Sequence, residues 1–161
     1  MGEAFGWRAY LQPKWMPLGG RQAVRWKGLE KMKILIDFPG GSRVDAHFDG
    51  FNVETDQPPD AKAPTPFEIF LASIGACAGI YVLGFCRQHN LPTDEICIIE
   101  HSYTGANEMV EKIDLKIRLP TAFPEKYRAA LIRSAELCKV KKHLEKPPKF
   151  EITTTRLADS A

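Results

Sequence analysis

The cysteine at position 77 lies in the segment SIGACAG, and its thiol is well suited to covalent chemistry. It belongs to a run of 18 residues, Ile69 to Cys86, that contains no charged side chain. A reactive cysteine needs access, a nearby cation that stabilises its thiolate, and a second thiol or an external reductant that completes a redox cycle. A buried free cysteine behaves instead as a small hydrophobic residue. The residue type alone favours this structural interpretation, so the rest of the chain must supply what reactivity requires.

Two further residues could meet these requirements. Cys77 lies twelve residues beyond a helix start predicted at Thr65, where the helix dipole has faded, so a cation must come from a tertiary contact. Arg43 follows a Gly-Gly turn on the polar face of a predicted strand, although an ordinary exposed arginine would show the same pattern. Cys138 ends a predicted amphipathic helix on its buried face and could meet Cys77.

Several common catalytic motifs do not occur in the sequence. It contains no P-loop, no G-x-G-x-x-G, no H-E-x-x-H, no G-x-S-x-G and no C-x-x-C. A zinc-stabilised module is a weaker alternative, because Cys86 and His89 are three residues apart and Cys97 and His101 are four apart. For the thiol interpretation we expect neither a metal nor an organic cofactor.

A three-stranded antiparallel meander must carry Arg43. Alternating polar and apolar residues predict strands at KILIDF, RVDAHF and FNVET, separated by the turn signals PGGS and DG. In the middle strand the alternation places Arg43 on the face opposite to Val44, Ala46 and Phe48. The stretch TDQPPDAKAP then predicts a loop.

A long helix that carries Cys77 is predicted from residue 66 to about Gln88. Thr65 can cap this helix, Pro66 suits its first position, and Glu68 completes a capping box. The cap is a sufficient explanation of Glu68, so a catalytic role for it is not needed. The apolar run is just long enough to cross a membrane, but its many glycines and alanines favour a buried helix.

The remaining segments predict a hairpin, two helices and a last strand. DEICIIEHSYTG and EMVEKIDLKIRLP form the hairpin, KVKKHL is a short helical piece, and KFEITTT is the strand. FPEKYRAALIRSAELC predicts an amphipathic helix whose buried face holds Tyr127, Ala130, Leu131, Ser134, Leu137 and Cys138. Because the strands are grouped apart from the helices, the predicted class is α+β, with antiparallel sheets, a long buried central helix and a second amphipathic helix.

The composition is that of an ordinary globular domain. The 161 residues have a net charge of +2 and 26% charged side chains, which does not indicate a nucleic-acid partner. Residues 1–31 carry six basic side chains and all three tryptophans, Trp7, Trp15 and Trp26, but lack the apolar run of a secretory signal. We therefore predict a basic, tryptophan-rich extension (1–31) and a single domain (32–161). Four cysteines without a signal peptide indicate a reducing compartment, so we expect a cytoplasmic protein without membrane attachment.

Two segments carry a family resemblance. PTPFEIFLASIGACAG and, about sixty residues later, AELCKVKKHLEKPPKFEI resemble the osmotically induced protein C and organic hydroperoxide resistance (OsmC/Ohr) family. Its members share a proline-led PxELxxAAxGxC helix start and a second cysteine after the next long helix. The resemblance extends from Met32 to about Thr155.

The resemblance implies a fold in which two chains intertwine as a homodimer with two active sites at the interface. It implies that Cys77 attacks a peroxide oxygen to give a sulfenic acid and an alcohol. It further implies that Cys138 condenses with the sulfenic acid as a disulfide, which a lipoyl or other dithiol reduces. Arg43, in GGSRVDA, matches the arginine that holds the thiolate and the peroxide.

Two departures from the family pattern indicate the OsmC-like branch. In the hydroperoxide-resistance branch the arginine pairs with a glutamate that aligns with Phe67 here, one position before Glu68. The Pro-Val that often follows the second cysteine is Lys139-Val140 here, which puts a cation beside Cys138.

Apolar side chains near Cys77 on the predicted helix suggest the substrate class. Phe67, Phe70, Ile74 and Tyr81 form the predicted substrate pocket, with Ile80 nearby, and would suit an alkyl or aryl hydroperoxide. The predicted function is therefore thiol-dependent reduction of organic hydroperoxides to alcohols. The alternative is a non-catalytic OsmC-like protein that binds a small hydrophobic ligand in the same cleft, with structural or redox-sensing cysteines.

Overall fold

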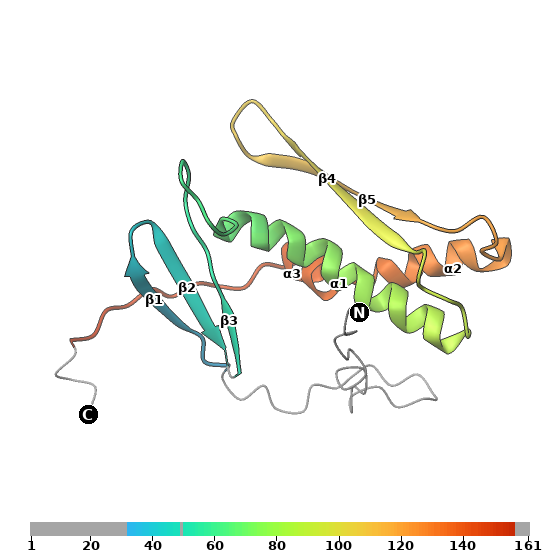
Figure 1. The fold of residues 1–161 in the computed structure, drawn as a ribbon, viewed down its shortest axis with the longest axis horizontal. Coiled ribbons are helices and arrows are strands. Elements are labelled where there is room, and N and C mark those ends of the chain that lie inside the picture. Colours follow the sequence, from blue (N-terminus) through green and yellow to red (C-terminus); the bar gives the residue numbers. More distant parts are fainter. Residues whose placement is uncertain (1–31, 49, 157–161) are drawn as a thin grey trace, which may run out of the picture.

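The computed structural model describes residues 32–48 and 50–156, so the predicted extension with its three tryptophans lies outside the described residues. The described chain has a mixed α+β fold with two antiparallel sheets and three helices (Figure 1). Its elements in chain order are β1 (Leu35–Gly40), β2 (Arg43–Phe48), β3 (Phe51–Val53), α1 (Pro66–Gln88), β4 (Cys97–Thr104), β5 (Val110–Arg118), α2 (Glu125–Ala135) and α3 (Lys139–Glu145).

The first sheet has the order β1-β2-β3, as the alternating sequence predicted. Its first turn depends on Gly40 and Gly41, whose φ angles of 123° and 63° lie in the region that favours glycine. The sheet lies beside the N-terminal end of α1, whereas β4 and β5 extend along that helix (Figure 1). Arg43 therefore belongs to a different part of the fold from the two cysteines.

The long helix α1 begins and ends where the sequence predicted. The Thr65 hydroxyl accepts a hydrogen bond from the backbone N–H of Glu68, and the Glu68 carboxylate accepts one from the backbone N–H of Thr65. This is the predicted capping box, and Pro66 occupies the first turn. One face of α1 is buried along Ile74, Ala78, Val82 and Cys86. The helix is long and apolar enough to cross a membrane by length and composition, but this face packs against protein.

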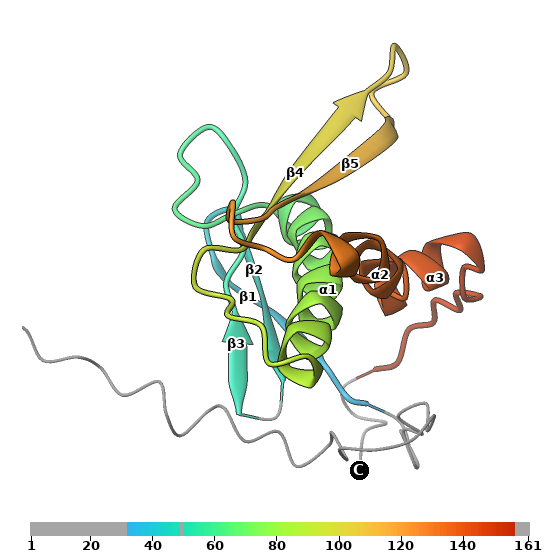
Figure 2. The ribbon, with the colours of Figure 1, turned by 90° about the vertical axis from the view of Figure 1, so that its right-hand side faces the viewer.

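The hydrophobic core lies where α1 meets α2 and the second sheet. Val82, Cys86 and Leu131 form its buried centre, surrounded by Phe85, Leu91, Ile96, Ile98, Ile117, Leu119, Phe123 and Ala135. Figure 2, which looks along the molecule, shows α2 and α3 together on one side of α1, with the β4–β5 hairpin rising away from the helices. The core thus fixes α1 relative to the segment that carries Cys138.

Three predictions about local structure were wrong. KFEITTT is not a strand, because residues 149–155 join no β-ladder among the described residues, and Ile152 is 95% exposed. Cys138 does not end the second helix: α2 ends at Ala135, and Cys138 caps the next helix, α3. Leu137 is exposed rather than buried, because the chain turns away from the face of α2 before reaching it.

The first sheet leaves its apolar side chains exposed. Ile36, Phe38 and Phe51 are all exposed, and Phe38 is exposed by 79%. The buried residue of β2 is instead Asp45, which is 6% exposed. Apolar strand residues of this kind normally pack against another layer, and the described part of the chain supplies none over this sheet.

Candidate functional site

The thiols of Cys77 and Cys138 lie close together at the junction of α1 and α3. Cys77 is half-buried near the middle of α1, and Cys138 is 1% exposed. The Cys138 thiol donates a hydrogen bond to the carbonyl oxygen of Ile74 at 3.7 Å and accepts one from the backbone N–H of Lys141 at 3.5 Å. Both cysteines are free thiols. The structure thus brings together two residues that are 61 positions apart in the sequence.

Opposing influences act on the Cys138 thiol. Burial raises the pKa of Cys138, and the hydrogen bond from the N–H of Lys141 lowers it in part. The neighbouring Cys77 adds to the increase through a side-chain hydrogen bond and through its charge. The net result is a pKa above the ordinary value, so Cys138 stays protonated at neutral pH while it is buried.

Tyr81 lies beside both thiols. Burial raises the pKa of the Tyr81 phenol, and the charges of Cys77 and Cys138 raise it further. Its backbone is tied to α2, because the Ser134 hydroxyl donates to the carbonyl oxygen of Tyr81 at 3.0 Å. Of the predicted pocket residues, Ile74 and Tyr81 therefore contact or surround the thiols.

Phe67 and Phe70 are more exposed than a closed pocket would make them. They stack on each other in the first turns of α1 with ring centroids 5.7 Å apart, and Phe67 is 53% exposed. Phe67 occupies the position of the glutamate that the resemblance to the hydroperoxide-resistance branch led us to look for. An aromatic ring has no oxygen that could accept a hydrogen bond from an arginine. Within the described chain these two rings are a surface feature at the start of α1.

Arg43 does not contact the thiols within the same chain. Its described ion-pair partners are Asp45, in the same strand, and Glu54, which follows the end of β3: Nη2 lies 2.5 Å from Asp45 and 3.5 Å from Glu54. The hydrogen bond to Asp45 raises the pKa of Arg43 further above its already high ordinary value. The predicted cation, Arg43, is therefore held by carboxylates at the first sheet and does not lie beside Cys77 of the same chain.

A loop anchored by Asp56 completes the surroundings of Arg43. Its carboxylate accepts hydrogen bonds from the Ser42 hydroxyl at 2.6 Å and from the backbone N–H groups of Gln57 and Lys62. These bonds, led by that from Ser42, lower the pKa of Asp56. Asp45, Glu54 and Asp56 thus place three carboxylates around Arg43.

A cavity of about 480 Å³ opens beside Cys138, between α2 and β5. Its floor is apolar, and Lys116, Arg128 and Lys141 stand among its lining residues. Cys138 and Ile74 also line it, so the cavity reaches the thiol site. It is large enough for a small organic molecule.

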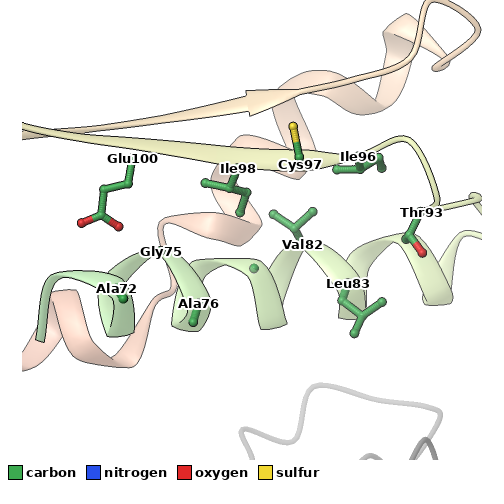
Figure 3. A pocket seen from close by; sticks show the side chains of 11 residues that line it. Ala72, Gly75, Ala76, Val82, Leu83, Thr93, Ile96, Cys97, Ile98 and Glu100 are labelled. Carbon is green, nitrogen blue, oxygen red and sulfur yellow. The ribbon is translucent and has the colours of Figure 1, made fainter. Parts of the chain in front are cut away.

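A second cavity, of about 510 Å³, lies between α1 and β4 (Figure 3). The carboxylate of Glu100 points from β4 toward α1 at Gly75, whereas the sulfur of Cys97 points away from the helix. Oε1 of Glu100 is buried and has no hydrogen-bond partner among the described residues. This cavity does not include Cys77 or Cys138.

Sequence reasoning missed Asp45 and Glu100. Asp45 could have been found from the spacing Arg43-x-Asp45, because alternate residues of a strand share a face. Glu100 gave no comparable signal, since its contact with Gly75 is tertiary. The zinc alternative fails in the described part of the chain: Cys86, His89, Cys97 and His101 form no cluster that could hold a metal ion.

Comparison with known proteins gives a family match. A family model described as OsmC-like protein matches residues 59–153, which is more than half of the chain and includes both site cysteines. None of the curated proteins compared with the sequence matches it.

Solved structures with the same fold support this match. An OsmC-like protein from Mycoplasma pneumoniae is 16% identical, with a TM-score of 0.62 over 74% of this chain and 91% of its own. A putative osmotic stress induced and detoxification response protein from Psychrobacter arcticus is also 16% identical, with a TM-score of 0.61 over 72% of this chain and 90% of its own. At this identity the likeness concerns the fold.

Proposed function

Since the chain belongs to the OsmC-like protein family, we propose that it is a thiol-dependent peroxidase that reduces organic hydroperoxides to alcohols. The observation that carries this proposal is the closeness of Cys77 and Cys138, with Cys77 the more accessible thiol. One half-buried thiol beside a buried second thiol is the arrangement that a two-cysteine redox cycle needs.

The proposed cycle begins at Cys77. Its thiolate attacks the outer oxygen of the hydroperoxide, the O–O bond breaks, and the leaving alkoxide takes up a proton as the alcohol, which leaves a sulfenic acid on Cys77. The Cys138 sulfur then attacks the Cys77 sulfur and releases water, which gives a disulfide. An external dithiol, of the lipoyl type or similar, reduces that disulfide and is itself oxidised.

We propose that the working form is a homodimer. Within the described chain Arg43 pairs with Asp45 and Glu54 and does not contact Cys77. A second copy would therefore have to supply the arginine that acts at Cys77. The exposed apolar side chains of the first sheet support a second copy as their cover, as do those of the extended segment 147–155, where Phe150 and Ile152 are exposed. The thiol chemistry also fits a reducing compartment, and we propose a cytoplasmic location.

The proposal is tested by one equivalent of cumene hydroperoxide on wild-type protein, followed by intact mass without reductant and a count of free thiols. We expect the loss of two hydrogens and a bridge that peptide mapping assigns to Cys77 and Cys138. Cys138→Ser should trap one added oxygen on Cys77, and Cys77→Ser should not react.

Cys97→Ser is the matched control, because Cys97 is an exposed thiol whose sulfur points away from α1. This variant should behave as wild type does. An unchanged mass with all four thiols still free in wild type would refute the peroxidase proposal.

A second candidate function is the binding of a small hydrophobic ligand without catalysis. The cavity of about 480 Å³ between α2 and β5 favours it, because its apolar walls are open to a ligand and reach Cys138. Leu115 lines this cavity, so this function predicts saturable binding of an apolar fluorophore that Leu115→Trp blocks. It also predicts no peroxide-dependent disulfide, which separates it from the first proposal.

A further inference from the structure

A smaller cavity, of about 290 Å³, adjoins the cavity of about 480 Å³ between α2 and β5. Only the larger cavity is lined by Arg128 of α2, and only the smaller one by Leu144 of α3. Four residues line both cavities: Ile74, Ile113, Leu115 and Lys141. The two cavities therefore form one groove along β5, from Arg128 to Leu144, which we call the β5 groove.

The β5 groove is apolar along its length. Val110 lines one end of it and Leu119 the other, so it follows the whole of β5, roughly 25 Å at about 3.3 Å per residue. Ile132 and Leu144 line the groove although they are 54% and 47% exposed. Apolar side chains that are exposed along one groove are typical of a binding site. The length of the groove suits an extended alkyl chain.

The larger cavity of the groove carries a surplus of positive charge. Three of its lining side chains are cationic and one is acidic: Lys116, Arg128, Lys141 and Glu136. The smaller cavity adds one acid and one base, Glu111 and Lys112. Nη1 of Arg128 donates to Glu125 at 3.0 Å, but a guanidinium has five N–H donors, so others can serve a second acceptor.

We propose that the β5 groove binds a long-chain carboxylate, with the carboxylate at Arg128 and Lys116 and the alkyl tail running past Ile74 toward Leu144. Lys141, midway along the groove, can lay its alkyl stem against the tail while its ammonium stays in water. The inference rests on the second candidate function and adds to it the class of ligand and the direction in which the ligand lies. Binding involves no oxidation of a cysteine, so it can be measured on fully reduced protein.

The experiment measures how competitors displace the neutral fluorophore N-phenyl-1-naphthylamine from reduced, full-length protein. The competitors are hexadecanoate, decanoate and hexadecanol, each below its micelle concentration. Hexadecanoate should bind about tenfold more tightly than decanoate, because only its tail reaches the smaller cavity. It should bind about threefold more tightly than hexadecanol, because only the acid carries a charge for Arg128 and Lys116. Added salt should reduce the second difference and leave the first.

Arg128→Gln tests the position of the carboxylate. It should weaken the binding of hexadecanoate and leave that of hexadecanol unchanged, and the double variant with Lys116→Gln should abolish the preference for the acid. Arg133→Gln is the matched control, because Arg133 is an exposed arginine of α2 that lines neither cavity of the groove.

Leu144→Trp tests the path of the tail, because the larger side chain fills the smaller cavity. It should weaken hexadecanoate about tenfold and leave decanoate unchanged. Leu137→Trp is the control, because Leu137 is also exposed but lines neither cavity. Thermal midpoints establish that each variant is folded, and Leu144→Phe replaces Leu144→Trp if the latter is not.

Each part of the inference can fail separately. Equal binding of hexadecanoate and hexadecanol, or equal effects of Arg128→Gln and Arg133→Gln, overturns the assignment of the carboxylate. A preference for the longer acid that persists in full in Leu144→Trp overturns the path of the tail. Absence of saturable fluorophore binding to wild type, as expected if a second copy covers the groove, overturns the second candidate function itself and is seen before any competitor is added.

Discussion

Glu100 and Gly75 meet across the space between β4 and α1: Oε2 of Glu100 lies 2.6 Å from the point that a β-carbon on residue 75 would occupy. No side chain can be added at Gly75 unless this carboxylate moves. The glycine therefore makes room for a carboxylate whose other oxygen is buried without a partner among the described residues.

Gly75→Ala should not stabilise the protein, although alanine in a helix interior is favoured over glycine by about 1 kcal/mol. The new methyl group displaces the Glu100 carboxylate, which offsets that gain. In a Glu100→Ala background the same change should raise the free energy of unfolding by about 1 kcal/mol, measured by urea titration. Gly79→Ala is the control, because its β-carbon would lie at an ordinary 3.7 Å from Ile98 and should stabilise both backgrounds. Equal effects of Gly75→Ala in both backgrounds would contradict this account.

Leu131→Ala should cost about 2–5 kcal/mol of the free energy of unfolding, because Leu131 is fully buried against Val82 and Cys86. Its neighbour Ile132 is 54% exposed, and Ile132→Ala should cost clearly less. Urea titration of the two variants measures the contrast, and similar losses at both positions would argue against this core.

Thr65→Ala should lower the free energy of unfolding by about 1 kcal/mol, because it removes the cap of α1. The Thr65 N–H and hydroxyl lower the pKa of Glu68 below 4.5, so this carboxylate stabilises the fold above that pH. The contribution is lost as pH falls through the folded pKa. The thermal midpoints of wild type and Glu68→Gln should therefore differ at pH 7 and converge as the pH falls below 4.5 and through the lower folded pKa of Glu68. A difference that stays constant with pH would show that the charge of Glu68 contributes nothing.

Tyr81→Phe should slow the oxidation of Cys77 by cumene hydroperoxide by about tenfold, because we expect the phenol of Tyr81 to donate a hydrogen bond to the peroxide oxygen. Burial raises the pKa of Tyr81 above 10, so the phenol keeps its proton throughout the assay range. The ratio of wild-type to variant rates should accordingly be constant between pH 6 and 9. Tyr127→Phe, at a tyrosine that packs against Phe85 and His89, is the control and should leave the rate unchanged.

The features that the sequence predicted well are local ones. Thr65, Pro66 and Glu68 satisfy one another within a single helical turn, so their spacing alone located the start of α1. The strands of both hairpins followed from alternation and turn residues for the same reason. The family resemblance pointed to Cys77 and Cys138, whose closeness depends on the packing of α1 against α3.

The features that the sequence did not reveal depend on distant partners. KFEITTT has the composition of a strand, but a strand exists only where a neighbour accepts its hydrogen bonds, and the described chain supplies none. Asp45 looked like a surface residue because aspartate usually is one, and its burial follows from the Arg43 and Thr55 partners. Cys138 lies past the end of α2 because the helix stops at Ala135, which no strong stop signal marks.

The cysteines of this fold lie at graded depths. Cys97 is exposed, Cys77 is half-buried, and Cys86 is fully buried with a pKa raised by burial. A thiol reagent should label Cys97 in the native protein, whereas Cys86 becomes reactive only when α1 separates from α2. The labelling rate of Cys86 would then report the free energy of that opening. The native cysteines can therefore report local unfolding, and no additional cysteine has to be introduced by mutation.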